Sequence, residues 1–407
     1  MIGLLIFILF YISVDIYAYQ SIKRLNSGRR LLIGYILASL LLMAVIIITF
    51  SGDREGGTFA GIRIYVTGIF VAYMTLKLGI ITFMVVEDIY RAFEWLFQKI
   101  SSPRAKKPVA SRRKFVSQLA LSVAAIPFAS LVGGMIKGKY DYRVFKYTLH
   151  FDDLPDAFDG YQITQFSDLH SGSFDNSKKV QYGIDMINEQ QSDAVFFTGD
   201  LVNTFASEFT DWQDQFKNIK AKDGVFSILG NHDYGDYHSW DTPTAKKVNF
   251  RNILQSHEEM GWHLLMNENT SIRRGDDQMK IIGVENWGSG RFKKNGDLDL
   301  AARDINPKDF KILLSHDPSH WNSVAKNHKS NCQLTLSGHT HGMQFGIEIP
   351  GFLKWSPAQY RYPQWAGVYE FAKRKINVNR GFGFLAYPGR VGIMPEITVI
   401  TLKKGKA

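Results

Sequence analysis

Apolar and polar positions divide the chain into two regions. Four apolar stretches, each with about the ~20 residues that cross a bilayer, precede residue 137: Ile2–Tyr19, Leu31–Phe50, Ile64–Val86 and Phe115–Ile136. Beyond residue 136, short runs rich in β-branched and aromatic residues alternate with helical spacing. The pattern therefore predicts an α-helical transmembrane region in residues 1–136 and a globular domain in residues 137–407.

The pattern of the second region predicts an α/β domain. Seven runs have the composition of strands: Tyr161–Phe166, Ala194–Thr198, Gly224–Leu229, Lys280–Val284, Phe310–Leu314, Gln333–Leu336 and Ile397–Leu402. Helical spacing covers Ser177–Glu189 and Thr244–Glu259, and Ser177 is a typical helix-capping residue. Such alternation implies that helices cover the faces of the sheets.

The net charge of +10 belongs almost entirely to the first region. Residues 1–136 carry 15 Lys and Arg against 6 Asp and Glu, whereas residues 137–407 carry 33 against 32. Basic residues beside apolar spans follow the positive-inside rule, while nucleic-acid binding usually needs a concentrated basic face. We therefore expect a lipid bilayer as partner and no nucleic acid.

The loops predict an orientation in the membrane. Basic residues gather in the first and third loops and their flanks: Lys23, Arg24, Arg29, Arg30, Arg91, Lys99, Arg104, Lys106, Lys107, Arg112, Arg113 and Lys114. The second loop, Ser51–Arg63, has two arginines that two acidic residues offset. We therefore expect a multi-pass plasma (inner) membrane protein whose first and third loops are cytoplasmic and whose globular domain is extracytoplasmic.

Two features of the apolar region each allow two interpretations. Lys77 lies near the centre of the third stretch; it either faces other helices and marks a functional position, or extends from a tilted helix to the membrane surface. The segment Ser111–Val116, with adjacent arginines before an apolar stretch, is similar to a twin-arginine export signal or is an ordinary basic helix flank. Both interpretations of the segment leave the following domain outside the cytoplasm.

Candidate chemistry lies in five short polar runs that follow predicted strands. The runs are Asp168-Leu169-His170, Gly199-Asp200, Gly230-Asn231-His232-Asp233, Ser315-His316-Asp317 and Gly338-His339-Thr340-His341. Imidazole and carboxylate groups suit divalent metals, and ligands gather at the carboxyl ends of strands in α/β sheets. The single cysteine, Cys332, lies outside these runs, which argues against a thiolate zinc site. The pattern predicts metal-assisted phosphoester hydrolysis.

The order of these runs resembles the calcineurin-like metallophosphoesterase superfamily over about residues 145–403. The ending Pro395–Leu402 is similar to the membrane-associated or exported bacterial branch of that superfamily. The resemblance implies a four-layer αββα sandwich, here preceded by the α-helical transmembrane region. It also implies two divalent metal ions, for which manganese, iron and zinc all suit the donor set.

The resemblance assigns roles to individual residues. It implies two metal sites, the first formed by Asp168, His170, Asp200 and His341 and the second by Asp200, Asn231, His316 and His339. His232 would face the scissile phosphate without binding metal, and Asp233 would orient it. The chain departs from many relatives at Asn203, where they have Asp, and at Met343, where they have Gly and where a larger side chain could narrow the substrate entrance.

The sequence indicates the substrate less specifically than it indicates the reaction. An aromatic stretch, Phe345–Trp365, follows the last ligand, and it either binds a lipid with a phosphate head group or packs over a sheet edge. Arg380 and Arg390 could bind a substrate phosphate. The leading hypothesis is a membrane-anchored phosphodiesterase or pyrophosphatase acting on a phospholipid or nucleotide-linked lipid. The alternatives are an enzyme for soluble extracytoplasmic phosphoesters or nucleotides, and a membrane transport or binding protein with a regulatory outer domain, which Lys77 alone favours.

Overall fold

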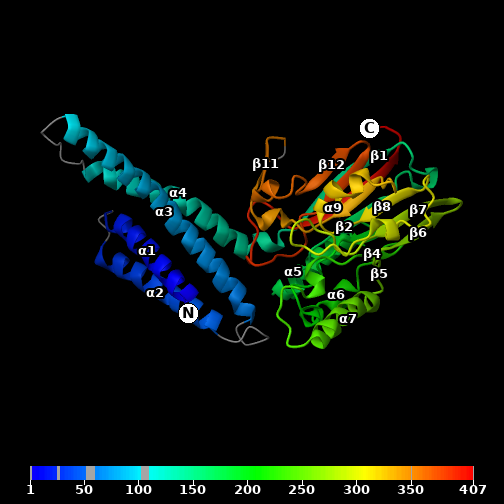
Figure 1. Ribbon diagram of the computed structural model, residues 1–407, viewed down its shortest axis with the longest axis horizontal. Coiled ribbons are helices and arrows are strands. Elements are labelled where there is room, and N and C mark those ends of the chain that lie inside the picture. Colours follow the sequence, from blue (N-terminus) through cyan, green and yellow to red (C-terminus); the bar gives the residue numbers. More distant parts are fainter. Residues whose placement is uncertain (1, 25–27, 52–59, 102–109, 350, 407) are drawn as a thin grey trace. The chain divides into compact units, whose positions relative to one another are not determined.

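The chain forms two compact units in the computed structural model, which describes residues 2–24, 28–51, 60–101, 110–349 and 351–406 (Figure 1). One unit comprises Met1–Ile136 with Ala386–Pro388, and the other comprises Lys137–Leu385 with Gly389–Ala407. Six charged loop residues that enter the predicted orientation lie outside the described residues: Asp53, Arg54, Glu55, Arg104, Lys106 and Lys107.

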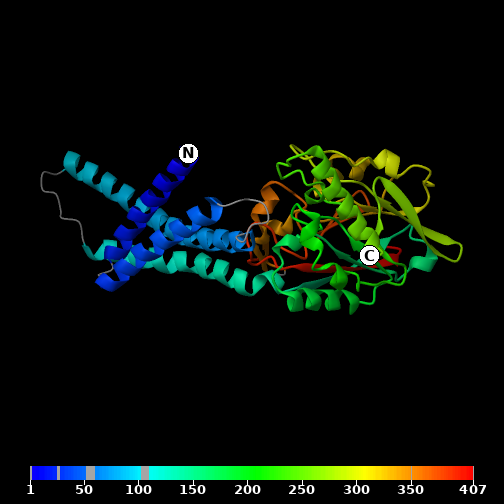
Figure 2. The same cartoon turned by 90° about the horizontal axis from the view of Figure 1, so that it is seen from below.

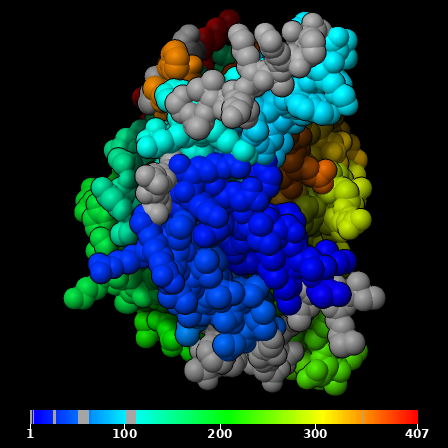
Figure 3. All heavy atoms as spheres, turned by 90° about the vertical axis from the view of Figure 1, so that its left-hand side faces the viewer, coloured from blue at the N-terminus to red at the C-terminus, as the bar shows by residue number. Residues whose placement is uncertain are grey.

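The first unit contains the predicted apolar helices. They are α1 (Ile2–Arg24), α2 (Arg29–Ser51), α3 (Ala60–Ser101) and α4 (Ala110–Ile136). Each is long and apolar enough to cross a membrane. Figure 3 shows α1 and α2 side by side on one face of this unit. Leu9 on α1 and Leu41 on α2 are exposed, as expected of helices that face lipid.

Helix α3 is much longer than the sequence pattern predicts. Its 42 residues span about 63 Å, roughly twice the hydrocarbon thickness of a bilayer. The helix continues past Val86 because no Gly or Pro interrupts it between Gly79 and Ser101. The predicted third span is therefore part of a longer helix.

Ion pairs join the extension of α3 to the start of α4. Arg112 Nη2 lies 3.2 Å from Glu87 Oε2, and Arg113 Nη2 lies 3.0 Å from Asp88 Oδ1. Tyr17 of α1 donates a 2.6 Å hydrogen bond to Asp88. Both arginines of the predicted export motif thus have partners within the helical unit, which fits a basic helix flank.

Lys77 lies inside the helical unit, with 1% of its surface exposed. Its Nζ is 2.6 Å from Asp15 Oδ1 on α1 and donates a 3.1 Å hydrogen bond to Ser39 Oγ on α2. The rings of Tyr11 and Tyr73 lie 4.3 and 4.0 Å from the same nitrogen. The interpretation that Lys77 extends to the membrane surface is therefore wrong, because its charge links three helices instead.

The second unit is built on two six-stranded sheets. The strand order of the first is β1 (Arg143–Phe151), β14 (Glu396–Lys404), β2 (Gln162–Phe166), β3 (Ala194–Phe197), β4 (Val225–Ser227) and β5 (His263–Leu264). The order of the second is β12 (Gly367–Phe371), β13 (Arg374–Val378), β9 (Leu334–Ser337), β8 (Phe310–Leu314), β7 (Asp277–Gly283) and β6 (Glu268–Arg274). Within each sheet four consecutive strands run parallel: β2 to β5 in the first, and β7, β8, β9 and β13 in the second.

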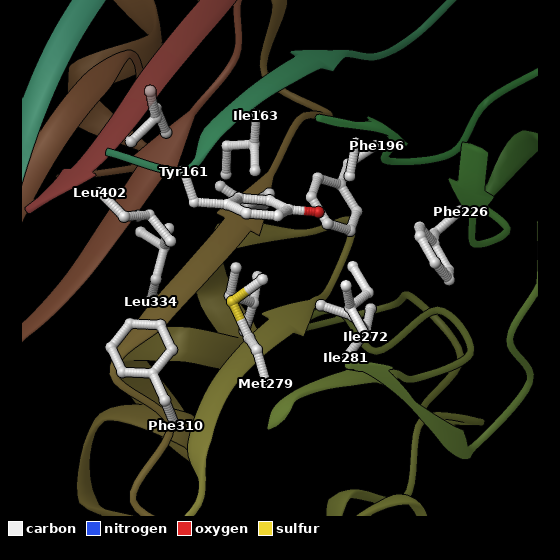
Figure 4. Packing of buried hydrophobic residues seen from close by; sticks show 14 of the residues in the cluster. Tyr161, Ile163, Phe196, Phe226, Ile272, Met279, Ile281, Phe310, Leu334 and Leu402 are labelled. Atoms are coloured by element: carbon white, nitrogen blue, oxygen red, sulfur yellow. The ribbon is translucent and has the colours of Figure 1, made fainter. Parts of the chain in front are cut away.

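The hydrophobic core lies between the two sheets (Figure 4). Ile163 and Phe196 of the first sheet face Met279 and Ile281 of the second, and all four are fully buried. Parallel strands are covered on both faces, which explains the continuous apolar runs in the sequence. The seven predicted strands are confirmed.

Helices cover the outer faces of both sheets (Figures 1 and 2). The helices beside the first sheet are α5 (Ser177–Asn188), α6 (Gln213–Phe216) and α7 (Pro243–Glu259), and those on the second are α8 (Leu298–Ala301) and α9 (Pro318–Ser323). His257 of α7 is hydrogen-bonded to Ser227 of β4 at 3.0 Å. Trp321 of α9 packs in a cluster with Leu313 of β8. The predicted four-layer sandwich is therefore confirmed.

Candidate metal centre

The polar runs meet where the carboxyl ends of the central strands of both sheets converge. The predicted ligands lie in the loops after five strands: Asp168 and His170 after β2, Asp200 after β3, Asn231 after β4, His316 after β8, and His339 and His341 after β9. Three overlapping groups have ligand atoms within 4.8 Å of one another: Asp168, His170 and His341; His170, Asp200 and His232; and Asp200, His316 and His339. The structure thus brings all the predicted metal ligands together.

Asp200 lies at the centre of the cluster. Its Oδ2 is 3.5 Å from His170 Nε2 and 3.1 Å from His316 Nε2. Its Oδ1 accepts a 2.8 Å hydrogen bond from the backbone N–H of His232. One carboxylate oxygen therefore faces both groups, which is the arrangement expected of a bridging ligand.

The second predicted site is ordered by hydrogen bonds around it. Asn231 Oδ1 is 3.1 Å from His316 Nε2 and 2.7 Å from His339 Nδ1. The Asn231 amide donates to Tyr237 Oη at 2.8 Å, which turns its oxygen toward the site. His316 Nδ1 lies 2.7 Å from the Thr198 carbonyl oxygen, so Nδ1 carries the proton and Nε2 faces the centre.

The first predicted site is supported from behind by a buried arginine. Asp168 Oδ1 is 3.3 Å from His341 Nε2. On the other side of that ring, Arg390 Nη2 is 3.1 Å from His341 Nδ1. Arg390 is fully buried and also donates to the carbonyl oxygens of Gly381 and Gly383 at 3.2 and 2.6 Å.

The prediction that Arg380 or Arg390 binds a substrate phosphate is wrong. Arg390 is enclosed behind His341, as described above. Arg380 is 1% exposed, and its guanidinium pairs with Glu396 and with Glu348. Both guanidinium groups are therefore committed to contacts inside the domain.

The backbone of the ligand loops is unusual. Five of the predicted ligands have positive φ, where L-residues are uncommon: Asp168 (55°), His170 (47°), Asp200 (60°), His339 (72°) and His341 (49°). Gly199 precedes Asp200 with φ 97°, and a Cβ there would lie 2.5 Å from the backbone nitrogen of Gly230. Such conformations cost free energy and concentrate at functional sites, so the strain points to this cluster as the working part of the domain.

The residues fit divalent metal ions. Among the described residues, both ring nitrogens of His170 and Nε2 of His341 are buried without a hydrogen-bond partner. Unpaired buried polar atoms are costly, and a metal ion would satisfy Nε2 of His170, which faces Asp200, and Nε2 of His341. Nitrogen and oxygen donors without thiolate suit manganese, iron or zinc. Burial lowers the pKa of His316, but the nearby Asp200 carboxylate outweighs burial and raises that pKa to about 10, so a metal ion that binds Nε2 would displace a proton from it.

His232 lies at the open side of the cluster. It is half-buried, whereas Asp168, His170 and Asp200 are buried. Its Nδ1 is 2.7 Å from the carbonyl oxygen of Asn203, and its ring meets that of His170 edge-on at 4.8 Å. His232 thus stands beside the ligands with Nε2 available, and its action without binding metal stays a prediction.

The prediction that Asp233 orients His232 is wrong, because the Asn203 carbonyl takes that place. Asp233 Oδ2 accepts hydrogen bonds from the backbone N–H groups of Asp200 and Gly230 at 3.0 and 2.8 Å. Its Oδ1 accepts from Leu201 and Val202 at 2.8 and 3.3 Å. Asp233 therefore holds the loop that carries Asp200.

Three aromatic residues contact the predicted site, and the sequence did not predict these contacts. Tyr362 Oη is 2.7 Å from His339 Nε2, and the Phe292 ring meets His339 edge-on at 5.2 Å. The Tyr237 ring lies 4.5 Å from that of His232. Only Tyr362 belongs to the aromatic stretch noted in the sequence; nothing in the pattern around Tyr237 or Phe292 distinguishes them from core residues.

Known proteins share both regions of the chain. Residues 1–139 match the family described as "Probable Calcineurin-like phosphoesterase, transmembrane domain", and residues 161–343 match "Calcineurin-like phosphoesterase". The metallophosphoesterase YkuE of Bacillus subtilis (strain 168) is 28% identical over 306 residues, which cover 72% of this chain and 98% of YkuE. A "transmembrane protein with metallophosphoesterase domain" of Danio rerio is 27% identical over 311 residues, 74% of this chain and 66% of that protein. Among solved structures, TT1561 of Thermus thermophilus is 13% identical, with a TM-score of 0.33 and coverage of 57% of this chain and 90% of TT1561.

Proposed function

Since this chain is a calcineurin-like metallophosphoesterase with a phosphoesterase transmembrane domain before its catalytic domain, we propose that it uses two metal ions to hydrolyse a phosphoester or pyrophosphate bond in a membrane lipid. The observation that carries the chemistry is the pair of ligand groups that share Asp200, with His232 at their open side. Asp168, His170, Asp200 and His341 would hold one ion, and Asp200, Asn231, His316 and His339 the other.

The residues of the site have two roles: some would hold the metal ions, and His232 would transfer a proton. Two bound divalent ions would activate water and neutralise phosphate charge. Because His232 Nδ1 faces the Asn203 carbonyl, its Nε2 is the nitrogen left for the substrate. When both ring nitrogens of His232 are protonated, Nδ1–H donates to the Asn203 carbonyl and Nε2–H is left for the leaving group. As water attacks phosphorus and gives up a proton to the solvent, the bond to the leaving oxygen breaks and the Nε2 proton passes to that oxygen. Asp233 keeps Asp200 in place through the backbone.

A lipid substrate is supported by how the catalytic domain is attached. Helix α4 ends at Ile136, and Gly138–Tyr140 are already buried within the catalytic domain. Tyr140 donates a 2.7 Å hydrogen bond to Asp175, so the chain has no long linker here. With a net charge of +1 in residues 137–407, nucleic acid is not among the proposed partners. Following the positive-inside rule, we place this domain outside the cytoplasm of a multi-pass plasma-membrane protein.

The proposal is tested with the full-length protein in lipid nanodiscs. Hydrolysis of bis-p-nitrophenyl phosphate should vanish with EDTA, return with manganese or zinc, and be lost in Asp200→Asn, while Asp185→Asn, on the exposed face of α5, should behave as wild type. Phosphate release from phospholipids and nucleotide-linked lipids is then compared with release from free nucleotides. Folded, metal-loaded protein without hydrolysis of any of these would refute the proposal. Hydrolysis of soluble phosphoesters alone would favour the second candidate, an enzyme for soluble extracytoplasmic substrates.

A further inference from the structure

A small hairpin stands apart from both large sheets. Strands β10 (Ile347–Ile349) and β11 (Leu353–Trp355) pair with each other in an antiparallel, two-stranded sheet. We call the segment from Met343 to Tyr360 the outer hairpin; it includes both strands and the short 3-10 helix Pro357–Tyr360. A two-stranded hairpin is marginally stable alone, so its contacts must come from the domain beneath it or from a partner.

The outer hairpin carries apolar side chains on its outward face, the reverse of what is usual for a sheet that faces water. Ile347 pairs with Trp355, and Ile349 with Leu353, which places these four side chains on one face. Ile347, Ile349 and Leu353 are exposed and Trp355 is half-buried. The other face carries the Glu348–Lys354 pair. A sheet that faces water on one side normally presents polar residues outward and apolar residues inward.

The charged groups of the outer hairpin contact the domain, although Lys354 as a whole is exposed and Glu348 is half-buried. Glu348 Oε1 lies 2.6 Å from Nη2 of the buried Arg380. Lys354 Nζ donates a 2.5 Å hydrogen bond to the carbonyl oxygen of Ala366. Because both charged groups contact the domain, they fix the orientation of the hairpin. Its apolar face therefore points away from the domain.

Exposed apolar side chains are concentrated here. Among the described residues of 137–407, eleven large apolar side chains are exposed, and six of them lie in the 18 residues of the outer hairpin: Met343, Ile347, Ile349, Phe352, Leu353 and Tyr360. Phe352, at the tip between the strands, is 82% exposed, and Tyr360 is 79% exposed. Contiguous exposed apolar patches mark interaction sites.

Both ends of the outer hairpin are joined to the metal centre. The segment begins two residues after His341, and Ser356 Oγ donates a 2.6 Å hydrogen bond to the carbonyl oxygen of Gly342. It ends two residues before Tyr362, whose hydroxyl contacts His339. Whatever binds the outer face is thereby held at a fixed place relative to the ligands.

We propose that the outer hairpin inserts its apolar face into the interface of the lipid bilayer and so presents lipid phosphate groups to the metal centre. This inference rests on the proposed function and names the surface that selects a lipid substrate. The bilayer is the chosen occupant because the same chain carries four apolar spans and no long linker separates them from the domain. Phe, Trp and Tyr side chains, which the hairpin presents, are the ones that settle at membrane interfaces.

The first test measures insertion without using activity. The single native cysteine, Cys332, is buried, so Phe352→Cys in the full-length protein can be labelled with an environment-sensitive maleimide dye. In nanodiscs of phosphatidylcholine and phosphatidylglycerol with doxyl-labelled lipid, the dye at residue 352 should shift to the blue and be quenched. The matched control is Tyr182→Cys, an exposed aromatic position on α5, which should show neither effect. Equal spectra and equal quenching at both positions would overturn the proposal, as would energy transfer between labelled copies without quenching by lipid.

The second test separates this inference from the proposed function. In nanodiscs, Phe352→Ser should lower the ratio of lipid-phosphate turnover to bis-p-nitrophenyl phosphate turnover, whereas Phe371→Ser, an exposed residue of β12, should keep the wild-type ratio. An unchanged ratio in Phe352→Ser would overturn the role of the outer hairpin while leaving the metallophosphoesterase proposal intact. If the wild-type protein hydrolysed neither substrate, the proposed function would be refuted. Quenching by doxyl-labelled lipid would then still show whether the outer hairpin inserts into the bilayer.

Discussion

Replacing Asp233 by Asn should weaken metal binding and folding together, and should do so by loosening the Asp200 loop. The carboxylate of Asp233 accepts four backbone N–H groups, two on each oxygen. An amide at this position substitutes an NH₂ group for one oxygen and places it against two N–H donors. Those two donors then lose their acceptor inside a fully buried pocket.

The size of the effect follows from these contacts. A hydrogen bond to a charged group contributes about 1.5–3 kcal/mol. Loss of two of them predicts that the Asp233→Asn variant is destabilised by roughly 3–6 kcal/mol. A residue that positions a metal ligand typically changes metal affinity about 10–100-fold, and we expect a loss in that range because Asp233 positions Asp200.

The assay compares three quantities in full-length protein. Thermal unfolding in detergent reports stability, competition with a fluorescent chelator reports manganese or zinc affinity, and bis-p-nitrophenyl phosphate turnover at saturating metal reports the chemical step. Asp185→Asn on the exposed face of α5 is the matched control. A variant with wild-type melting and metal affinity but low turnover at saturating metal would refute this reasoning, since it would mean that Asp233 acts on His232.

Three further predictions concern other parts of the chain. His232→Asn should lower turnover by about 10²–10⁴-fold with unchanged metal content by mass spectrometry; wild-type turnover would contradict its role as proton donor. Lys77→Leu should destabilise the helical unit by about 3–5 kcal/mol, because Asp15, whose side chain is only 17% exposed, is left without its cation. Adding Asp15→Leu should recover part of the loss, and unchanged melting in detergent would refute this. Burial lowers the pKa of His257 to about 3 and that of His320 to about 4. Both stay neutral when folded, so unfolding should become easier as pH falls from 6.5 toward 4, by up to roughly 1.4 kcal/mol per pH unit for each; a melting temperature independent of pH over that range would disagree.

Most central strands could be predicted from the sequence, because a strand that is buried on both faces has a continuous run of apolar residues. Phe310–Leu314 is such a run and forms β8 as predicted. The strands at the sheet margins, and β13 next to the margin, were missed because only part of their surface is covered. The residues of β6, Glu268–Arg274, are mostly polar, with Ile272 alone fully inside. Their pairing depends on neighbouring strands that local sequence does not reveal.

The candidate metal ligands could be identified from the sequence because their side-chain types and spacing are themselves the signal. Their hydrogen-bond partners could not, since Thr198 and Asn203 act through backbone carbonyls that every residue possesses. The error over Asp233 has a simple geometric origin. His232–Tyr234 forms a 3-10 turn, in which successive side chains point about 120° apart. Asp233 therefore points away from the His232 ring although the two residues are adjacent in the sequence.

The ligands come from both halves of the sandwich, and this has a mechanical consequence. Asp168, Asp200 and Asn231 follow strands of the first sheet, whereas His316, His339 and His341 follow strands of the second. Each proposed metal ion would therefore cross-link the two sheets at one end. A chain with one cysteine cannot form an internal disulfide bond, and the ions would serve that purpose here. Chelation should thus free the ligand-bearing ends of the sheets to move apart while the apolar core still holds their middles together.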